Sequence, residues 1–219
     1  MDQGTLAEAK NLVFEKNDAS LVAALNAQTV TGDFVLENAI FNQNFSRQNI
    51  ISVNVSNGSS TPSTFFMKNV VMSDHNLNQA ADTVTVTGSN TLGTFKASNI
   101  TLANNMCSSA SGNRCRFNST LTNRVYNNIL HWNDVISPAG SAGSGNVDLG
   151  TTGGTNFLRP GDANGLDNIY FTADDGYNFV NSSASGVNSG VTGADIPAAD
   201  ILNRSRNGNT DVGAYESTP

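Results

Sequence analysis

One seven-residue sequence pattern occurs five times along the chain, and this repeat limits the possible folds more than any other feature. Each copy begins at an asparagine and has a large apolar residue at its fourth position: NLVFEKN from Asn11, NAIFNQN from Asn38, NVVMSDH from Asn69, NITLANN from Asn99 and NNILHWN from Asn127. Successive copies start 27, 31, 30 and 28 residues apart. A regular spacing of roughly 20 to 50 residues indicates one supersecondary unit per copy, stacked on its neighbours.

The residues around each first asparagine predict strands joined by corners. Apolar residues two apart, such as Phe34 and Leu36 before Asn38, face one side of a strand. Asparagine tolerates the left-handed conformation that a corner needs, and its amide bonds backbone groups. The seventh position predicts a second corner, at Asn17, Asn44, His75, Asn105 and Asn133. We expect the corner amides to form a ladder with a rise of about 4.8 Å, in which the imidazole of His75 replaces one amide.

This pattern predicts an all-β fold, a single-stranded right-handed parallel β-helix. Asn, Ser, Thr and Gly crowd the chain while charged residues are only 13%, a composition that disfavours long helices. We assign residues 1–136 to the β-helix rungs. Residues 137–219 should form a Gly-rich loop, the last rungs and an irregular C-terminal cap of the same domain. The start, TLAEAK, is interpreted as a short helical cap, or else as the point where upstream rungs have been removed.

Two columns of equivalent positions can face outward. The third repeat position is mostly apolar and alternates with the buried fourth position, unless the corner shifts the register: Val13, Ile40, Val71, Thr101 and Ile129. An outward apolar column predicts a covering segment or a protein partner, including self-association. The position five before the first asparagine holds Thr64, Thr94 and Thr122, and such a threonine array would suit an ice-binding face.

Charge and cysteine content restrict the partners and the compartment. The net charge is -7 and the 11 basic residues are scattered, which argues against a nucleic-acid partner. No run of 18 apolar residues predicts a membrane span, and no signal peptide is recognisable. The chain is therefore intracellular or a piece of a larger exported protein. Cys107 and Cys115 are either two free thiols or a local disulfide, and a disulfide would favour an oxidising compartment.

The repeats, together with three further motifs, resemble a known group of proteins. The motifs are TADDG at Thr172–Gly176, DILNRSR at Asp200–Arg206 and DVGAYE at Asp211–Glu216. They are similar to the C-terminal portion of bacterial surface-associated parallel β-helix (pectin-lyase-like) proteins of the polymorphic outer-membrane and choice-of-anchor type. The resemblance implies export and a secreted or cell-surface location, usually without an assigned activity. The absence of an export signal and of a C-terminal sorting segment then suggests a fragment.

Several side chains are candidates for chemistry, each with a structural alternative. A polysaccharide lyase would need a basic residue facing carboxylates or Ca²⁺, and Lys68 and Lys96 lie on neighbouring units, although both also fit solvated surface lysines. A glycoside hydrolase would need two carboxylates within roughly 5 to 9.5 Å, and Asp174 and Asp175 are the only adjacent acidic pair.

Calcium is the one cofactor that the sequence suggests. Oxygen ligands recur around DANGLD, at Asp162, Asn164, Asp167, Asp174 and Asp175. The spacing starts like an EF-hand loop but lacks its glycine and terminal glutamate, so a turn held by Asx hydrogen bonds is the competing interpretation. We interpret Asp200, Arg206, Asp211 and Glu216 as a structural charge network.

The leading functional hypothesis is a non-catalytic, adhesin-like module at the cell surface that binds carbohydrate or protein. The alternative is a polysaccharide lyase or glycoside hydrolase of pectin-lyase-like fold. The third is an ice-binding protein.

Overall fold

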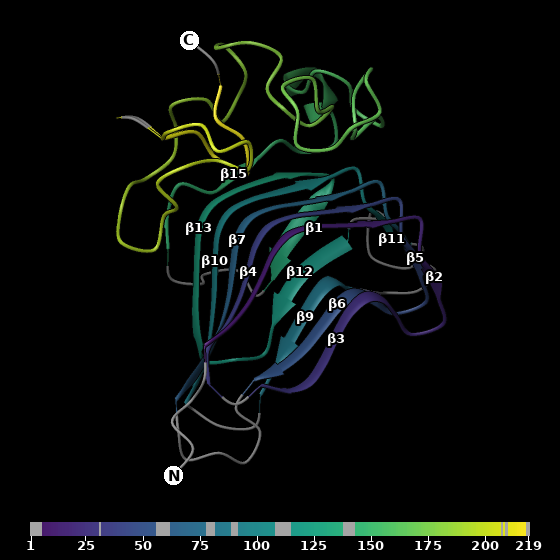
Figure 1. The fold of residues 1–219 in the computed structure, drawn as a ribbon, viewed down its shortest axis with the longest axis vertical. Helices are drawn as coiled ribbons and strands as arrows, with labels where there is room; N and C mark the ends of the chain where they lie inside the picture. Colours follow the sequence, from purple (N-terminus) through teal and green to yellow (C-terminus); the bar gives the residue numbers. More distant parts are fainter. Residues whose placement is uncertain are drawn as a thin grey trace.

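The computed structural model describes residues 6–30, 32–55, 62–77, 82–88, 92–107, 115–137, 143–206, 208 and 210–217. The chain winds through three parallel sheets and returns to the first sheet after each turn (Figure 1). We call one passage through the three sheets a rung; the first rung is β1, β2 and β3. The predicted parallel β-helix is confirmed.

The strands follow one order in every rung. Sheet A is the six-stranded sheet β1 (Ala7–Glu15), β4 (Phe34–Asn42), β7 (Ser63–Ser73), β10 (Gly93–Ala103), β13 (Asn123–Trp132) and β15 (Val147–Asp148). Sheet B has the two-residue strands β2 (Asp18–Ala19), β5 (Phe45–Ser46), β8 (Asn76–Leu77) and β11 (Met106–Cys107). Sheet C has β3 (Val22–Val30), β6 (Asn49–Val55), β9 (Asp82–Thr87), β12 (Cys115–Ser119) and β14 (Asp134–Ser137).

An asparagine in the left-handed conformation bends each long strand of sheet A into two limbs (Figure 1). These residues have φ from 49° to 57°: Asn11, Asn38, Asn69, Asn99 and Asn128. The prediction of Asn127 for the fifth rung is wrong by one residue, because Asn127 pairs with Ser98 and the corner falls on Asn128. We call the limb before the asparagine the first limb and the limb after it the second limb.

The second corner lies one residue earlier than predicted in the first four rungs. Its left-handed residues are Lys16, Gln43, Asp74, Asn104 and Asn133. The following residue turns inward and builds a ladder that is exposed at its first member and buried from the second rung on. We call it the inner ladder: Asn17, Asn44, His75, Asn105 and Asp134. The backbone N–H of Asn17 donates to Asn44 Oδ1 at 2.9 Å, that of Asn44 to His75 Nδ1 at 3.0 Å, and that of His75 to Asn105 Oδ1 at 3.1 Å. The imidazole of His75 therefore replaces one amide acceptor, as expected.

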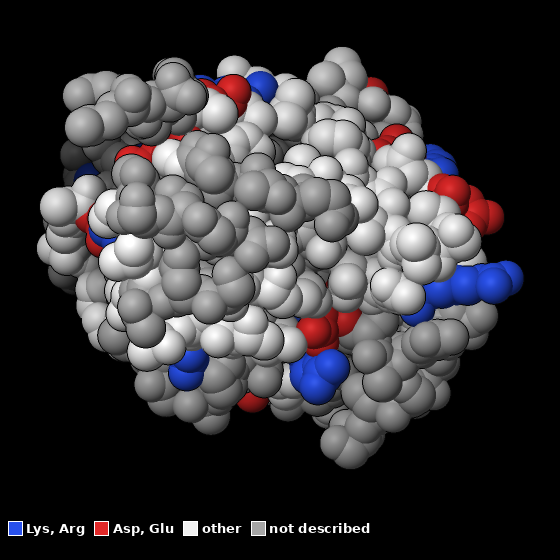
Figure 2. Space-filling view, turned by 90° about the horizontal axis from the view of Figure 1, so that it is seen from below, with Lys and Arg blue, Asp and Glu red and all other residues white. Residues whose placement is uncertain are grey.

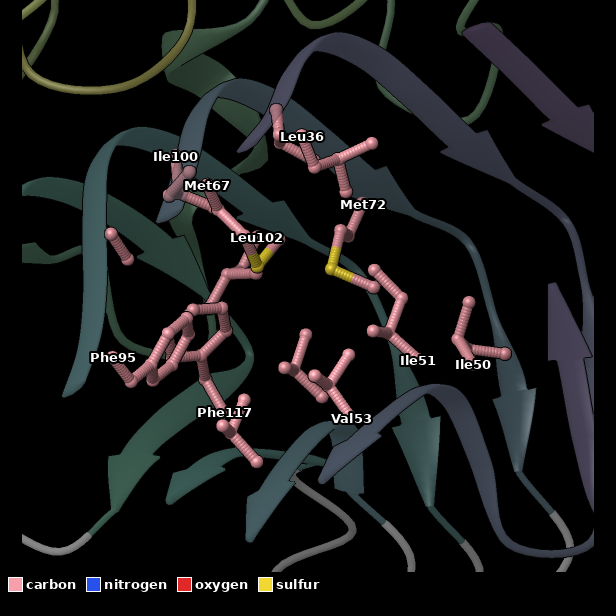
Figure 3. Packing of buried hydrophobic residues seen from close by; sticks show 14 of the residues in the cluster. Leu36, Ile50, Ile51, Val53, Met67, Met72, Phe95, Ile100, Leu102 and Phe117 are labelled. Atoms are coloured by element: carbon pink, nitrogen blue, oxygen red, sulfur yellow. The ribbon is translucent and has the colours of Figure 1, made fainter. Parts of the chain in front are cut away.

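Side chains stacked from rung to rung fill the interior. Phe34, Phe65 and Phe95 stack with ring centroids 5.4 and 5.5 Å apart. Figure 3 shows Met67, Leu102 and Phe95 pointing into the space between the sheets, toward Phe117 of sheet C. Because each column repeats similar apolar residues, one rung buries the apolar side chains of the next.

We call residues 143–206, 208 and 210–217 the C-terminal residues. They lie against the outer face of the second limb (Figure 1). They contain β15 and one short 3-10 helix, η1 (Gly153–Asn156), but little other regular structure. Their apolar side chains bury the outward column of the second limb: Phe157, Tyr177, Phe179, Val212 and Tyr215 pack with Ile40, Val71 and Leu130. Of the two expected covers for this column, a segment of the chain itself is the one found.

Two details of the outward column need correction. Ile129 packs in the interior, and Leu130 takes its place because it pairs with Thr101. Self-association through the column is wrong for Ile40, Val71 and Thr101, which are buried beneath the chain's own C-terminal residues. Val13, on the first rung, is 39% exposed.

Polar contacts fasten the C-terminal residues to the corner asparagines. Asn69 Nδ2 donates to the carbonyl of Ala199 at 2.9 Å, and Asn128 Oδ1 accepts from the N–H of Val191 at 2.7 Å. The buried guanidinium of Arg206 donates to Glu216 at 2.7 Å and to Asn69 Oδ1 at 3.2 Å.

The two other members of the expected charge network receive backbone bonds. Asp200 pairs with Arg204 at 2.6 Å and accepts the N–H of Glu216 at 2.9 Å. Asp211 accepts the N–H of Asn188 at 2.7 Å. These carboxylates therefore fix the turns of the C-terminal residues.

Two expectations for the rest of the chain are now decided. Ala7 to Lys10 of TLAEAK belong to β1 and pair with β4, so a helical cap there is wrong; Thr5 lies outside the described residues. Cys107 and Cys115 form a disulfide that joins β11 to β12. None of the described helices is long and apolar enough to cross a membrane.

Candidate functional site

The outer face of the first limb carries a shallow groove that the C-terminal residues leave open. Side chains at alternate positions of this limb face outward, and the strand register places Glu8, Val35, Phe66, Lys96 and Val125 in one row. The groove has a volume of about 160 Å³ and is lined by Leu6, Asp33, Val35, Thr64, Phe66 and Lys96.

Two lysines flank the aromatic ring of Phe66 in this groove. Lys68 Nζ lies 4.4 Å from the ring centroid and Lys96 Nζ lies 5.8 Å from it. Lys96 is also held by Asp195 of the C-terminal residues, whose two carboxylate oxygens lie 2.9 and 3.0 Å from Nζ. A cation near an aromatic face is attracted by its quadrupole, so these contacts hold both lysines beside the ring.

Acidic and hydroxyl groups complete the rim. Asp33 Oδ1 accepts the N–H of Thr64 at 3.0 Å, which fixes the carboxylate at one end of the groove. On the same face Lys10 lies 3.1 Å from Glu37 on the adjacent rung and 3.4 Å from Glu8. The bond to Glu37 raises the pKa of Lys10. The face therefore alternates positive and negative groups around an apolar floor.

The structure brings Lys68 and Lys96 together but not with Asp174 and Asp175. Those two acids lie in the C-terminal residues, and their oxygens accept local hydrogen bonds. Asp174 accepts the N–H of Leu166 at 2.7 Å and the hydroxyl of Thr172 at 2.8 Å. Asp175 accepts the hydroxyl of Tyr215 at 2.9 Å and two backbone N–H groups. Burial raises the pKa of Asp175 to about 6.

The predicted calcium ligands are used in the same local way. Asp167 Oδ1 accepts the N–H of Ile169 at 2.9 Å, as in an Asx turn. Asp162 bonds through its backbone to Arg159 and Gly165. Within the described ranges, no three acidic, histidine or cysteine side chains gather as metal ligands would. A calcium site at Asp162, Asn164, Asp167, Asp174 and Asp175 stays a prediction.

The expected threonine column is shorter than the sequence suggested. Thr64 pairs with Thr94, but Thr94 pairs with Asn123, so Thr122 falls outside the column. The cause is the same one-residue shift that moves the corner from Asn127 to Asn128. Two aligned threonines remain next to Asp33 and Asn123, which removes the extended array that an ice-binding face needs.

Sequence reasoning missed several residues of the groove region, among them Phe66, Asp33 and Asp195. A signal for Phe66 was present, because an aromatic between the inward Phe65 and Met67 must face outward. Asp195 had no such sequence signal, since it contacts Lys96 from 99 residues away in the chain.

The basic side chains do not gather in a patch on the face that Figure 2 shows. Figure 2 views the molecule from the lower end in Figure 1, and its Lys and Arg side chains lie singly, some beside acidic ones.

Comparisons with known proteins give no independent assignment. No protein-family model matches the chain, and no curated protein is similar to it. The resemblance to bacterial surface-associated pectin-lyase-like proteins therefore stays a prediction.

Proposed function

We propose that the protein is a non-catalytic carbohydrate-binding module that uses the groove around Phe66. The observation that carries the proposal is the half-buried Phe66 ring between Lys68 and Lys96 on a sheet face. A sugar ring has a face of C–H groups and a rim of hydroxyls. An apolar floor with a few fixed polar groups at its edge matches both.

The rim supplies the hydrogen bonds that such a ligand needs. Asp33 has a carboxylate to accept from sugar hydroxyls, while Thr64 and Lys68 can donate to hydroxyl oxygens. Bonds in which one partner is charged are about twice as strong as neutral ones. A sugar lying on Phe66 would draw Lys68 from the ring toward the sugar's own oxygens.

The size of the groove favours a weak contact with one sugar residue of a longer polymer. Its volume of about 160 Å³ is below the roughly 300 Å³ of typical small-molecule pockets. Several weak contacts along a polymer, or several modules on one surface, strengthen binding through effective concentration. This is the behaviour of an adhesin, and the disulfide Cys107–Cys115 supports a secreted or cell-surface location.

A glycan array tests this proposal. The wild-type chain should bind at least one class of glycan, and Phe66→Ala and Lys68→Ala should each weaken that binding at least tenfold. Phe45→Ala and Lys16→Ala are matched controls on solvent-facing positions of sheet B and its preceding corner, and they should bind as wild type does. Binding that survives Phe66→Ala unchanged, or no binding to any glycan by folded protein, would overturn the proposal.

One observation favours an enzyme as the second candidate. Lys10 lies beside the carboxylate of Glu37 on the adjacent rung, 3.1 Å away on the same face. A polysaccharide lyase needs basic and acidic side chains on neighbouring rungs, and because Glu37 raises the pKa of Lys10, this lysine would serve as a cation that binds an acidic sugar and not as the base. Chromatography of acidic and neutral polysaccharides after incubation, with and without Ca²⁺, separates the two functions, because only an enzyme yields unsaturated or shortened products.

A further inference from the structure

A charged contact joins the C-terminal residues to the edge of the groove around Phe66. Asp195 lies in a turn in which the N–H of Ile196 donates to the carbonyl of Gly193 at 3.1 Å. Both carboxylate oxygens of Asp195 accept from Lys96 Nζ, at 2.9 and 3.0 Å. The side chains of Lys96 and Asp195 are 32% and 35% exposed, and Lys96 lines the groove. A ligand in the groove can therefore reach this ion pair.

Two corner asparagines hold the segment that carries Asp195. Asn128 Oδ1 accepts the N–H of Val191 at 2.7 Å, and Asn128 Nδ2 donates to the carbonyl of Val191 at 2.8 Å. At the other end of the segment, Asn69 Nδ2 donates to the carbonyl of Ala199 at 2.9 Å. The segment is thus fixed to sheet A on the third and fifth rungs, and its acidic side chain contacts the fourth rung between them.

The strands beside Lys96 place uncharged residues next to it. Its register partners are Phe66 on the third rung and Val125 on the fifth. The other lysine at the ring, Lys68, lies 4.4 Å from the Phe66 centroid. Among the ion pairs of the described residues, the one that neutralises Lys96 is therefore supplied by Asp195 and not by a neighbouring strand.

With Asp195 in place, acids outnumber lysines on this face. The charges that the groove and its surroundings carry come from four acids and three lysines: Glu8, Asp33, Glu37 and Asp195, with Lys10, Lys68 and Lys96. Without Asp195 the two signs would balance, and Lys96 would be a free cation near the aromatic ring. A ligand carboxylate therefore meets a cation that is already paired, together with an excess of negative charge, and juxtaposed like charges disfavour binding.

We propose that Asp195 makes the groove selective for uncharged sugars over acidic ones, an inference that rests on the proposed carbohydrate-binding function. Asp195 acts through Lys96. It occupies the cation that a carboxylate or sulfate group of a sugar would pair with, and it adds a negative charge that repels such a group. Selectivity of this kind comes from a repulsive element placed against the wrong ligand. The ligand class is a hexose polymer without acidic substituents.

Sugars that differ only in charge test this selectivity. The probes are immobilised tetrasaccharides of glucose, galactose and mannose, each compared with the form in which the C6 alcohols are oxidised to carboxylates. Biolayer interferometry should show that the wild-type chain binds at least one neutral probe more tightly than its oxidised form. Asp195→Asn should shift the ratio of the two affinities toward the oxidised form by about fivefold at low ionic strength, the scale of one partly exposed ion pair. Added salt should reduce the shift.

Three further variants separate the charge of Asp195 from other effects. Asp195→Glu keeps the charge and should keep the wild-type ratio. Asp195→Asn combined with Lys96→Gln removes the freed cation, so the ratio should return to about its wild-type value. Asp167→Asn is the matched control, because it removes one acidic charge from an exposed turn of the C-terminal residues, and its ratio should equal that of wild type.

Circular dichroism establishes that each variant is folded before it is compared. A wild-type preference for the oxidised probes, or a ratio that Asp195→Asn leaves unchanged, would overturn the inference while the proposed function stands. A shift that persists in the double variant would assign the effect to the turn and not to Lys96, and would overturn it too. Failure of wild type to bind any probe would also overturn it, and the glycan array decides separately whether the proposed function fails.

Discussion

Replacing His75 by asparagine should remove much of the chain's sensitivity to acid. His75 is fully buried in the inner ladder, and desolvation lowers its pKa from 6.5 to about 3. Nδ1 accepts the N–H of Asn44, so the neutral ring carries its proton on Nε2, which has no partner among the described residues. Protonation of the folded state would bury a charge, which is why the neutral ring persists.

The sign and size of the effect follow from the difference in proton binding. Between pH 6.5 and about 3 the unfolded chain binds a proton at His75 and the folded chain does not, so stability falls as the pH falls. Each pH unit in this window costs about 1.4 kcal/mol. Acidification from pH 7 to pH 4.5 should therefore cost wild type about 3 kcal/mol through this one group.

The variant His75→Asn should be similar to wild type at pH 7. Its amide can accept from Asn44 and can donate to the carbonyl of Phe41, as Asn44 does to Phe14 one rung earlier. Relief of the unpartnered N–H gains about 1 to 3 kcal/mol. The smaller side chain leaves a cavity that costs about 1 kcal/mol or more. The two effects largely cancel, whereas the acid-dependent difference remains.

Urea unfolding followed by fluorescence of Trp132, the only tryptophan, measures this difference at pH 7, 5.5 and 4.5. Other carboxyl groups titrate in both proteins, so the difference between the two pH profiles isolates His75. His131→Asn is the matched control and should retain the acid loss of wild type. An equal loss of stability in wild type and His75→Asn on acidification would show that His75 is not the source of the acid sensitivity.

Three further predictions concern the corner, the C-terminal contacts and the disulfide. Asn38→Ala should destabilise by about 1 kcal/mol, because alanine disfavours the left-handed conformation, while Asn38→Gly should cost less; urea midpoints of both variants decide it. Arg206→Met should cost about 3 to 5 kcal/mol, because it leaves Glu216 as a buried charge without its partner, and thermal unfolding should show it as a large drop in Tm; a shift of one degree or less would contradict this. Reduction of Cys107–Cys115 should lower the free energy of unfolding by about 2.5 kcal/mol from loop entropy alone. A melting temperature unchanged by a reductant would argue against this stabilisation by the disulfide.

The rungs could be predicted from the sequence because each repeats the same local requirements. A left-handed corner favours asparagine, and the apolar residue three positions later must face the interior. The corner at Asn38 and the buried position of Phe41 could therefore be predicted from the sequence. The corner of the fifth rung was predicted one residue too early because Asn127 and Asn128 are both asparagines that can adopt the left-handed conformation. Burial of Tyr126 and Ile129, a tertiary effect, selects the second asparagine.

The C-terminal residues and the groove were harder to predict, for a different physical reason. Their turns depend on carboxylates such as Asp175 and Asp200, which accept bonds from their own loops and from distant groups such as Tyr215. No periodic pattern in the sequence predicts such contacts. The groove likewise joins Phe66 on one rung to Asp33 on another and to Asp195 of the C-terminal residues, so it exists only once the rungs are stacked.

Carbohydrate binding in the groove around Phe66 can be tested by a nuclear magnetic resonance titration of the isotope-labelled chain with an oligosaccharide fragment of a glycan that it binds. Chemical shifts should change first at Thr64, Phe66, Lys68 and Lys96, with little change at Asp174 and Asp175. Shift changes that cluster on the C-terminal residues or on sheet C, and leave Phe66 unaffected, would contradict it.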